Sequence, residues 1–378
     1  MSKRIRVCVV GVGNCFVSLA TGIVKYAKDK KLTGINYEDI GGYTPDSLDF
    51  VLGFDIDKRK VGKSIAEAIQ QKPNCTPMLC TKEELESSPN VIGKVYKGPV
   101  LDGFAKHMLD YPEEKSFRLS EEPELDEEEI KTLLLANEVD VIVNYLPTGS
   151  QKATEFWAEM CLKTKIPFMN CIPVFIASDP VWCNRFKEAG VPICGDDMQS
   201  QLGSSIVSSR LQSLFMERGL KVNMHTQLNL GGNTDFLNFL DPSRLSSKKI
   251  SKENVIKNQY KIAEKDYSDT DIFAGPNGYI PYHGDNKVAY INIEAEGFGG
   301  QSVSLECRLK VCDSANSAGV VVDALRFLKV AHRLGMKGNL LGPSVFYQKS
   351  PLHPICFEDA RQMCDELARV KFENETFD

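Results

Sequence analysis

The first residues that could do chemistry are two glycines near the N-terminus. Gly11 and Gly13 follow the apolar run Ile5–Val10 and precede a helix-like stretch that starts at Asn14. Because glycine carries no side chain, such a strand, turn and helix lets backbone N–H groups approach a pyrophosphate. A tight turn without a ligand is the alternative. Phe16 keeps that alternative open, since the third position of the usual fingerprint is Gly or Ala.

Two aspartates could complete a dinucleotide site. In such sites an acidic residue about 20 positions after the glycines binds a ribose hydroxyl. Here Asp55 lies 44 positions after Gly11, at the end of a second apolar run, residues 50–54, and Asp57 follows it. If residues 29–49 are an insertion, both aspartates still lie at the end of the second strand. We therefore expect them on the ribose side of the site.

A third candidate is a basic stretch in the middle of the chain. Lys248 and Lys252 are four positions apart, so they share one face of a helix. A lysine is a compact cation with several donors, and burial shifts its pKa readily, which suits phosphate binding and proton transfer. A solvated basic helix face is the alternative.

The elements that must position these residues alternate between strand and helix. Unbroken apolar runs, typical of buried parallel strands, are separated by helical stretches that include residues 151–163 and 180–189. The strands are expected at 5–10, 50–54, 139–145, 166–170 and 191–194. This order favours an α/β fold with a doubly wound, Rossmann-type parallel sheet.

The pattern of apolar and polar residues changes after Arg210. Residues 222–230 and 289–295 alternate between apolar and polar, which indicates half-buried antiparallel strands, and residues 275–278 are expected to form a turn. A strong helical period returns at 313–334. We therefore predict a Rossmann domain from 1–202 plus 313–378, interrupted by a catalytic and oligomerisation domain of α+β type with a largely antiparallel sheet at 203–312.

Composition limits the class of protein. The chain has 378 residues, 42% hydrophobic and 25% charged, with a net charge of −6, which fits a globular protein of two or three domains and opposes binding to nucleic acid or anionic membranes. No apolar run approaches the length of a membrane span. Its twelve scattered cysteines show no zinc-like spacing and are expected to be reduced thiols. These features predict a cytoplasmic protein. The acidic stretch 121–129 is expected to be a solvated loop that leads into a helix.

Six segments together resemble the myo-inositol-1-phosphate synthase family, in its short prokaryotic form. They occur in the family's order from Arg6 to about Pro351. The segments are Asn170–Ser178, Gly195–Gln201, Gly231–Asn238, Ser246–Lys252, His283–Lys287 and Cys312–Ser314. Six motifs in order are more specific than one glycine fingerprint.

The resemblance implies an NAD-dependent isomerase of myo-inositol biosynthesis. In that reaction D-glucose 6-phosphate is oxidised at C5 by NAD, the ketone acidifies the C6 protons, C6 attacks the C1 aldehyde, and C5 is reduced again. The reaction is redox-neutral overall. The resemblance also implies a homotetramer, and a divalent or monovalent cation whose ligands the sequence leaves unknown.

The resemblance also assigns residues to roles. The catalytic residues would be Lys248, Lys252, Lys287, Lys349 and Asp197; the cofactor would meet Gly11, Gly13, Asn14, Cys15, Asp55, Asp57 and Asp313; the substrate would meet Ser200, Gln201, Asn233, Asp235 and Asn238. Lys287 and Lys252 are expected near the developing oxyanions, and Lys248 and Lys349 near phosphate or as proton donors. Helix caps and turns are the local alternatives for Asp197, Ser200, Gln201, Asp313 and the residues of 233–238.

Two departures from the family pattern leave the substrate open. Gln199 stands where the family usually has Lys, and the serine-rich run Ser204–Ser209 replaces a different sequence. The alternatives are a paralogue that cyclises another sugar phosphate, an NAD(P)-dependent dehydrogenase that accumulates reduced cofactor, and a non-catalytic NAD-binding protein.

Overall fold

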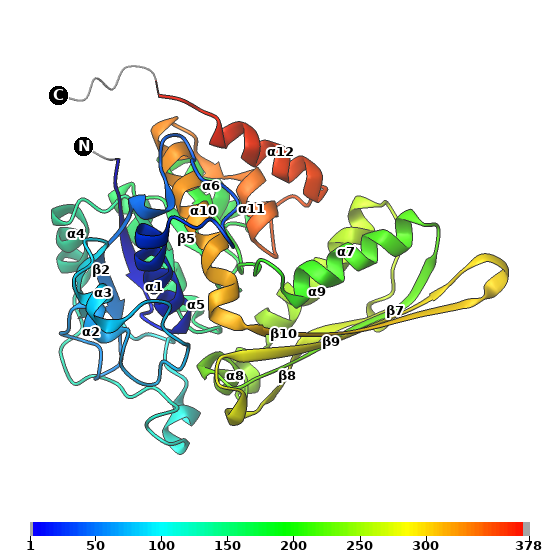
Figure 1. The fold of residues 1–378 in the computed structure, drawn as a ribbon, viewed down its shortest axis with the longest axis horizontal. Coiled ribbons are helices and arrows are strands. Elements are labelled where there is room, and N and C mark those ends of the chain that lie inside the picture. The colour runs from blue at the N-terminus through cyan, green and yellow to red at the C-terminus, as the bar shows by residue number, and fades with distance from the viewer. Residues whose placement is uncertain (1–2, 373–378) are drawn as a thin grey trace.

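The computed structural model describes residues 3–372, so the terminal residues of the predicted Rossmann domain, 1–2 and 373–378, lie outside the described part. Two sheets, one of seven strands and one of four, lie toward opposite ends of the long axis of the molecule (Figure 1). Within the described residues, no helix is both long and apolar enough to cross a membrane.

The first sheet is parallel throughout, with strand order β11-β6-β5-β4-β1-β2-β3. The order reverses between β1 and β4, which is where doubly wound sheets open a crevice for a ligand. The strands are β1 (Ile5–Val10), β2 (Leu48–Asp55), β3 (Val91–Lys97), β4 (Val141–Asn144), β5 (Phe168–Asn170), β6 (Pro192–Cys194) and β11 (Gly338–Asn339). The predicted α/β class and Rossmann-type sheet are confirmed.

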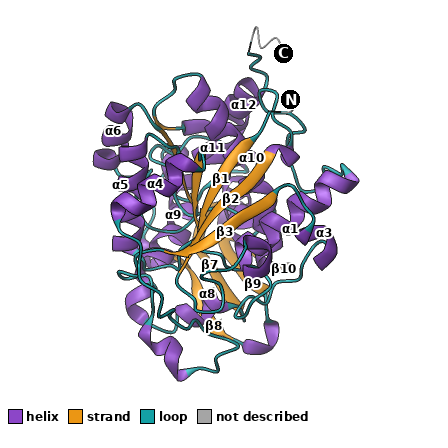
Figure 2. Ribbon diagram, turned by 90° about the vertical axis from the view of Figure 1, so that its left-hand side faces the viewer, coloured by secondary structure: helices purple, strands orange, loops and turns teal. Residues whose placement is uncertain are grey.

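Helices cover both faces of this sheet. Successive side chains of a strand point to opposite faces, so each strand contributes to two apolar clusters. Val7 and Val9 belong to one apolar cluster and Cys8 and Val10 to the other. The first cluster includes side chains of α1 (Asn14–Asp29) and α10 (Asp313–Arg333), and the second those of α4 (Glu127–Ala136), α5 (Gln151–Thr164) and α6 (Pro180–Ala189). Figure 2 shows β1, β2 and β3 side by side with helices around them.

Phe16 is accommodated in the core rather than at a close helix–strand contact. Its side chain is fully buried, and its ring meets that of Phe50 edge to face with centroids 5.0 Å apart. The helix therefore packs on the sheet through an aromatic pair, so Phe16 does not disturb the glycine turn.

Two long stretches between the predicted elements, residues 29–49 and 84–130, have different structures. Residues 29–49 are mostly loop and pack on α10, where the buried Arg326 donates to the carbonyls of Tyr37 and Tyr43. Residues 84–130 contain strand β3, which was not predicted from the sequence because Gly93 and Lys94 interrupt its apolar run. The acidic run lies where it was expected, since Asp126 caps α4. The short helices α2 (Ile65–Ala68) and α3 (Lys82–Glu86) lie between β2 and β3.

The second sheet has the order β10-β9-β7-β8 and is largely antiparallel, as expected. Its strands are β7 (Lys221–Gly231), β8 (Ile272–Tyr279), β9 (Asn286–Glu296) and β10 (Ser302–Cys312). Strand β8 pairs parallel to β7 and contains residues 275–278, so the predicted turn there is wrong. Pro276 is tolerated because β8 is an edge strand.

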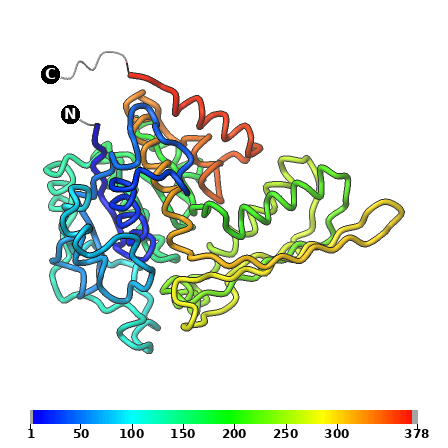
Figure 3. The backbone as a smooth tube through the Cα atoms, viewed as in Figure 1, coloured from blue at the N-terminus to red at the C-terminus, as the bar shows by residue number. Residues whose placement is uncertain are grey.

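Only one face of this sheet is covered by helices of the described chain, namely α7 (Ser204–Glu217) and α9 (Ser246–Ile262). Phe215 of α7 packs on Ile291 and Ile293 of β9. Leu228 and Tyr290 on the other face are 41% and 45% exposed. Strands β7, β9 and β10 extend well beyond the first sheet (Figure 3).

The chain then returns to the first sheet. Helix α10 begins directly after β10, packs along α1 and leads to β11, and α11 (Leu341–Tyr347) and α12 (Phe357–Ala368) follow. The short helix α8 (Thr234–Asn238) lies after β7. These connections bring the ends of β1, β4 and β6 close to α8, α9 and the start of α10, where the functional site is formed.

Candidate active site

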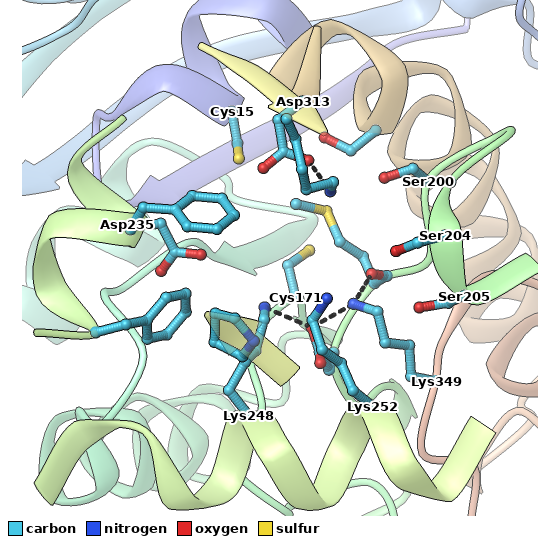
Figure 4. A pocket seen from close by; sticks show the side chains of 18 residues that line it. Cys15, Cys171, Ser200, Ser204, Ser205, Asp235, Lys248, Lys252, Asp313 and Lys349 are labelled. Atoms are coloured by element: carbon cyan, nitrogen blue, oxygen red, sulfur yellow. Dashed lines mark hydrogen bonds and ion pairs between the residues drawn. The ribbon is translucent and has the colours of Figure 1, made fainter. Parts of the chain in front are cut away.

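All four lysines singled out from the sequence line one cavity of about 680 Å³. Lys248 and Lys252 come from α9, Lys287 from β9, and Lys349 from the segment after α11. Figure 4 shows Lys248, Lys252 and Lys349 pointing into a common space, opposite Asp313 and beside three serines. The shared helix face expected for Lys248 and Lys252 therefore faces a cavity rather than solvent.

Asp197 lies at the base of this cavity, between two of the lysines. Its Oδ1 accepts from Nζ of Lys248 at 3.2 Å and of Lys349 at 2.8 Å, and its Oδ2 accepts from the Ser251 hydroxyl at 2.6 Å. Burial opposes ionisation, but these partners hold the pKa of Asp197 well below its usual value. Asp197 is therefore a permanent carboxylate that organises two cations.

The same ion pairs affect the two lysines differently. Burial opposes the charge of Lys248, but Asp197 and Asp235 hold its pKa above the usual value. Burial lowers the pKa of Lys349 to about 8, although Asp197 favours its charge. Lys248 is therefore a fixed cation, whereas Lys349 changes charge near neutral pH.

Lys252 differs from the other three lysines. It is 6% exposed, and its amine has no hydrogen-bond or ion-pair partner among residues 3–372. Burial lowers the pKa of Lys252 well below its usual value, and three neighbouring lysines lower it further. A neutral amine in the cavity can accept a proton.

Lys287 forms an ion pair with Asp313 at the start of α10. Burial opposes the charge of Asp313, but Lys287 holds its pKa below the usual value. The neighbouring Asp285 was missed by the sequence analysis, although it lies inside a quoted motif. Its carboxylate accepts from Ser314 N at 3.1 Å and from Asn233 Nδ2 at 3.0 Å, so it joins α10 to the loop before α8.

A second cavity of about 710 Å³ lies beside the glycine turn and shares walls with the first. Gly13, Asn14 and Cys15 line it, and Cys15, Asp235 and Asp313 belong to both cavities. The two cavities form one cleft at the end of β1 where the strand order reverses.

The residues present fit the pyrophosphate of a dinucleotide. Among residues 3–372, nothing lies within 4 Å of a Cβ at Gly13, so a side chain there would point into open space, and no side chain caps the first N–H groups of α1. At Gly11, φ is +94° and a Cβ would lie 2.6 Å from the Tyr145 carbonyl oxygen, so glycine is required. An uncapped helix start with open space in front of it is a typical anion site.

The two aspartates after β2 have different environments. Asp55 accepts from Val12 N at 2.8 Å and lies 3.6 Å from the buried amine of Lys60, so it supports the glycine turn. Asp57 is fully buried and binds the Arg59 guanidinium and Arg118 N. The carboxylate of Asp57 is therefore already paired with neighbouring residues and does not line either cavity.

Residues 98–126 cross from the first sheet to the second beside this cleft. Arg118 pairs with the chain after β2, while Tyr111 packs on Tyr279 of β8 with ring centroids 6.2 Å apart. The His107 ring nitrogen lies 2.9 Å from the Leu237 carbonyl oxygen of α8, and Phe117 lines the second cavity. The 98–126 segment thus connects both parts of the protein across the cofactor side of the cleft.

The predicted substrate residues are not all brought together. Ser200 and Asp235 line the lysine cavity, and burial raises the pKa of Asp235. Asn233 caps α8 and borders the second cavity, and Asn238 is buried and donates to the Thr148 carbonyl. Gln201 points away and donates to the Gly34 carbonyl, outside both cavities.

The two departures from the family pattern lie on different sides of the site. Gln199 donates to the Gln348 carbonyl at 2.5 Å and lies behind Lys349, outside the lysine cavity. Ser204 and Ser205 line the cavity, at the uncapped start of α7. Ser204 and Ser208 donate to Asn229 and Gln227 of β7, which fixes the helix on the sheet.

Within residues 3–372 there is no group of three or more His, Cys, Asp or Glu that could hold a metal ion. All twelve cysteines are free thiols. The cation ligands that the sequence analysis left unknown are therefore not supplied by such a cluster in the described part of the chain.

Known proteins similar to this chain agree with the geometry. Residues 203–314 match the model of the myo-inositol-1-phosphate synthase family. An inositol-3-phosphate synthase of Mycobacterium tuberculosis is 38% identical over 375 residues, which cover 98% of this chain and 95% of that protein. The resemblance drawn from the six motifs is confirmed.

Two solved structures share the fold. The crystal structure of a protein named Ari2 is 32% identical, covers 97% of this chain and 98% of its own, and superposes with a TM-score of 0.75. An inositol-3-phosphate synthase from Caenorhabditis elegans gives a TM-score of 0.76 at 16% identity, with 99% of this chain and 87% of that chain covered. The second likeness concerns the fold alone.

Proposed function

Because this chain belongs to the myo-inositol-1-phosphate synthase family, we propose that it converts D-glucose 6-phosphate into 1L-myo-inositol 1-phosphate, the reaction of an inositol-3-phosphate synthase. The observation that carries the proposal is the convergence of four lysines on one cavity that opens toward a glycine turn. The cyclisation passes through oxyanions and proton transfers beside a phosphate, and amines held away from water suit each of these steps.

NAD is the cofactor we propose, with its pyrophosphate at Gly13 and the start of α1. When bound, it supplies the redox chemistry at C5 of the sugar. C5 ends at the oxidation level at which it began. Cys15 and Asp313 border both cavities, so they lie where the cofactor and sugar would meet.

The start of α7 is proposed to hold the substrate phosphate. Helix α7 has no side-chain cap at Gly203, and Ser200, Ser204 and Ser205 line the cavity at this end. Figure 4 places Lys349 beside these serines. Free N–H groups, hydroxyls and one ammonium group match the oxygens of a phosphate.

The remaining groups match the proton transfers. The neutral Nζ of Lys252 can accept the C6 proton, and the resulting ammonium would then face the enolate oxygen. Lys287, held by Asp313, is proposed to stabilise the oxygen on C5. Lys248, held charged by Asp197, is proposed to stabilise the oxygen formed on C1, which takes up the proton that Lys252 removed from C6.

Other parts of the proposal concern the whole chain. We propose residues 203–312 as the catalytic and oligomerisation domain, because α9 and β9 supply three of the four lysines and the uncovered sheet face can meet another copy in a homotetramer. A cytoplasmic location is proposed on the cysteine-rich sequence.

The test is turnover with glucose 6-phosphate and a catalytic amount of NAD, followed by phosphorus NMR. The expected product is inositol phosphate at many equivalents per NAD. Turnover only with another sugar phosphate would favour a paralogue, for which Ser204 and Ser205 are the motivating residues. Stoichiometric accumulation of reduced cofactor would favour a dehydrogenase.

A further inference from the structure

The carboxylate of Asp197 is held at both of its oxygens by different kinds of donor. Oδ1 accepts from the amines of Lys248 and Lys349, at 3.2 and 2.8 Å. Oδ2 accepts from the Ser251 hydroxyl at 2.6 Å and has no other hydrogen-bond partner within residues 3–372. The position of Oδ2 therefore depends on one hydroxyl group.

Ser251 is placed for this contact by two elements. It lies on α9 between Lys248 and Lys252, is fully buried, and accepts a hydrogen bond from the Ser350 hydroxyl at 3.3 Å. Ser350 directly follows Lys349. The serine pair thus forms a second buried link between α9 and the 349–350 segment, parallel to the link made by the lysines.

The backbone hydrogen bonds around Asp197 do not involve its side chain. Lys349 N donates to the Asp197 carbonyl at 2.8 Å, and Asp196 and Ser350 exchange two backbone hydrogen bonds. These bonds fix the main chain of Asp197 and Lys349 but do not touch the carboxylate. Within the described residues 3–372, the hydrogen bonds that restrain rotation of the carboxylate come from its three side-chain donors.

We propose that Ser251 is a positioning residue, whose hydroxyl holds the Asp197 carboxylate so that one oxygen pairs with both Lys248 and Lys349. The proposal deepens the proposed function and rests on it for its kinetic test. Without the hydroxyl, Oδ2 would be a buried acceptor without a partner, which is costly. The carboxylate would then turn away from its present orientation, and its contact with Lys349 would loosen.

The effect should be visible at Lys349, because its charge depends on Asp197. The charged groups that face Lys349 are Asp197, Lys248 and Lys252 from the 197 loop and α9, and Lys287 from β9. Asp197 is the one group among them that favours the ammonium form of Lys349. A looser contact with Asp197 should lower the pKa of Lys349 and increase its neutral amine at pH 7.

The experiment compares Ser251→Ala with Ser213→Ala. Ser213 is a matched control, since its hydroxyl donates to Gln259 of α9 at 2.7 Å and is away from both cavities. In the protein without substrate, the rate at which acetic anhydride modifies Lys349 is followed by peptide mass spectrometry. Turnover of glucose 6-phosphate is then measured as a function of pH.

In Ser251→Ala we expect faster modification of Lys349 and at least a ten-fold lower kcat than in the wild type. The alkaline limb, the fall in activity at high pH, should begin at a lower pH than in the wild type. Ser213→Ala should match the wild type in all three. Ser251→Thr keeps the hydroxyl, so its alkaline limb should stay at the wild-type position.

Three results would overturn the proposal: an unchanged modification rate in Ser251→Ala, equal changes in Ser251→Ala and Ser213→Ala, or a shifted limb in Ser251→Thr. Absence of turnover in the wild type would instead count against the proposed function. The modification rates would still decide whether Ser251 positions Asp197, so the two failures are distinguishable.

Discussion

The amine of Lys252 is buried and has no hydrogen-bond or ion-pair partner among residues 3–372. A substitution at this residue should therefore affect turnover and stability differently. Replacing it by Met removes the proposed proton acceptor, so turnover should fall by at least a hundred-fold, within the range of general-base catalysis. The same change removes a buried polar group without a partner. The melting temperature should therefore stay equal or rise, since an apolar side chain of similar length suits the site.

The control for this prediction is Lys249→Met on the same helix. Lys249 is half exposed and pairs with Glu253, outside both cavities. It should keep wild-type turnover and melting temperature. A Lys252→Met protein that retains turnover would show that the amine is not needed as a base.

Lys349 gives the site a pH dependence with a defined sign. Burial lowers its pKa to about 8, so it is charged below that pH and neutral above it. If the ammonium form binds phosphate, kcat/KM should fall as pH rises through about 8. Lys349→Arg keeps a positive charge at higher pH. Its activity should be lower than that of the wild type but should not fall as pH rises through this range. A wild-type profile that instead rises through pH 8 would contradict the assignment.

The positions of individual site residues could be predicted from the sequence only where the residues belong to a motif. The four lysines and Asp197 were identified in this way, and they meet in one cavity. Asp285 and Ser251 were missed because they contact neighbouring side chains within the protein, and such contacts depend on residues from other elements. Gln201 lies next to Ser200 in sequence but points to the opposite side of the loop.

At the level of elements, apolar runs predicted the buried strands well, since parallel strands covered on both faces leave a clear pattern. Strand β3 was missed, and residues 275–278 were expected to be a turn. Both are edge strands, whose exposed residues and tolerated proline hide the strand pattern. The 98–126 segment could not be predicted to join the two parts, because its contacts are long-range.

This segment should affect how firmly the cofactor is held. Arg118→Ala removes hydrogen bonds from the Arg118 guanidinium to the Tyr111 and Met108 carbonyls and to the Ser116 hydroxyl, which shape the segment beside the cleft. We expect faster loss of bound NAD on gel filtration and faster proteolysis within 98–126. Lys58→Ala, which removes an exposed pair with Glu113, is the control and should change neither. Equal retention of NAD in both variants would contradict a role in holding the cofactor.

At the scale of the whole molecule, the uncovered face of the second sheet predicts assembly. Leu228 and Tyr290 are directly paired across β7 and β9 and leave apolar surface exposed. Leu228→Asp should lower the mass measured by light scattering from that of a tetramer to a smaller species. Val181→Asp, at an exposed apolar residue of α6 outside this sheet, serves as the control and should leave the mass unchanged. A wild-type monomer would contradict the proposed tetramer.

The net charge of the chain does not predict the local charge of its site. A chain with a charge of −6 still places four lysines around one cavity, so an acidic protein can bind an anionic sugar phosphate. The pattern of apolar residues changes after Arg210 and the helical period returns at residue 313, close to where the chain passes to the second sheet and leaves it again. The closeness of the two parts at the cleft required the structure.

The central claim is that one site oxidises and reduces the same carbon around a cyclisation. It is tested most directly with glucose 6-phosphate deuterated at C5, a catalytic amount of NAD, and NMR and mass spectrometry of the product. The account predicts inositol phosphate that retains the deuterium at the carbon derived from C5, without net accumulation of reduced cofactor. Deuterium found in accumulated reduced cofactor, or a deuterated substrate left unconverted, would contradict it.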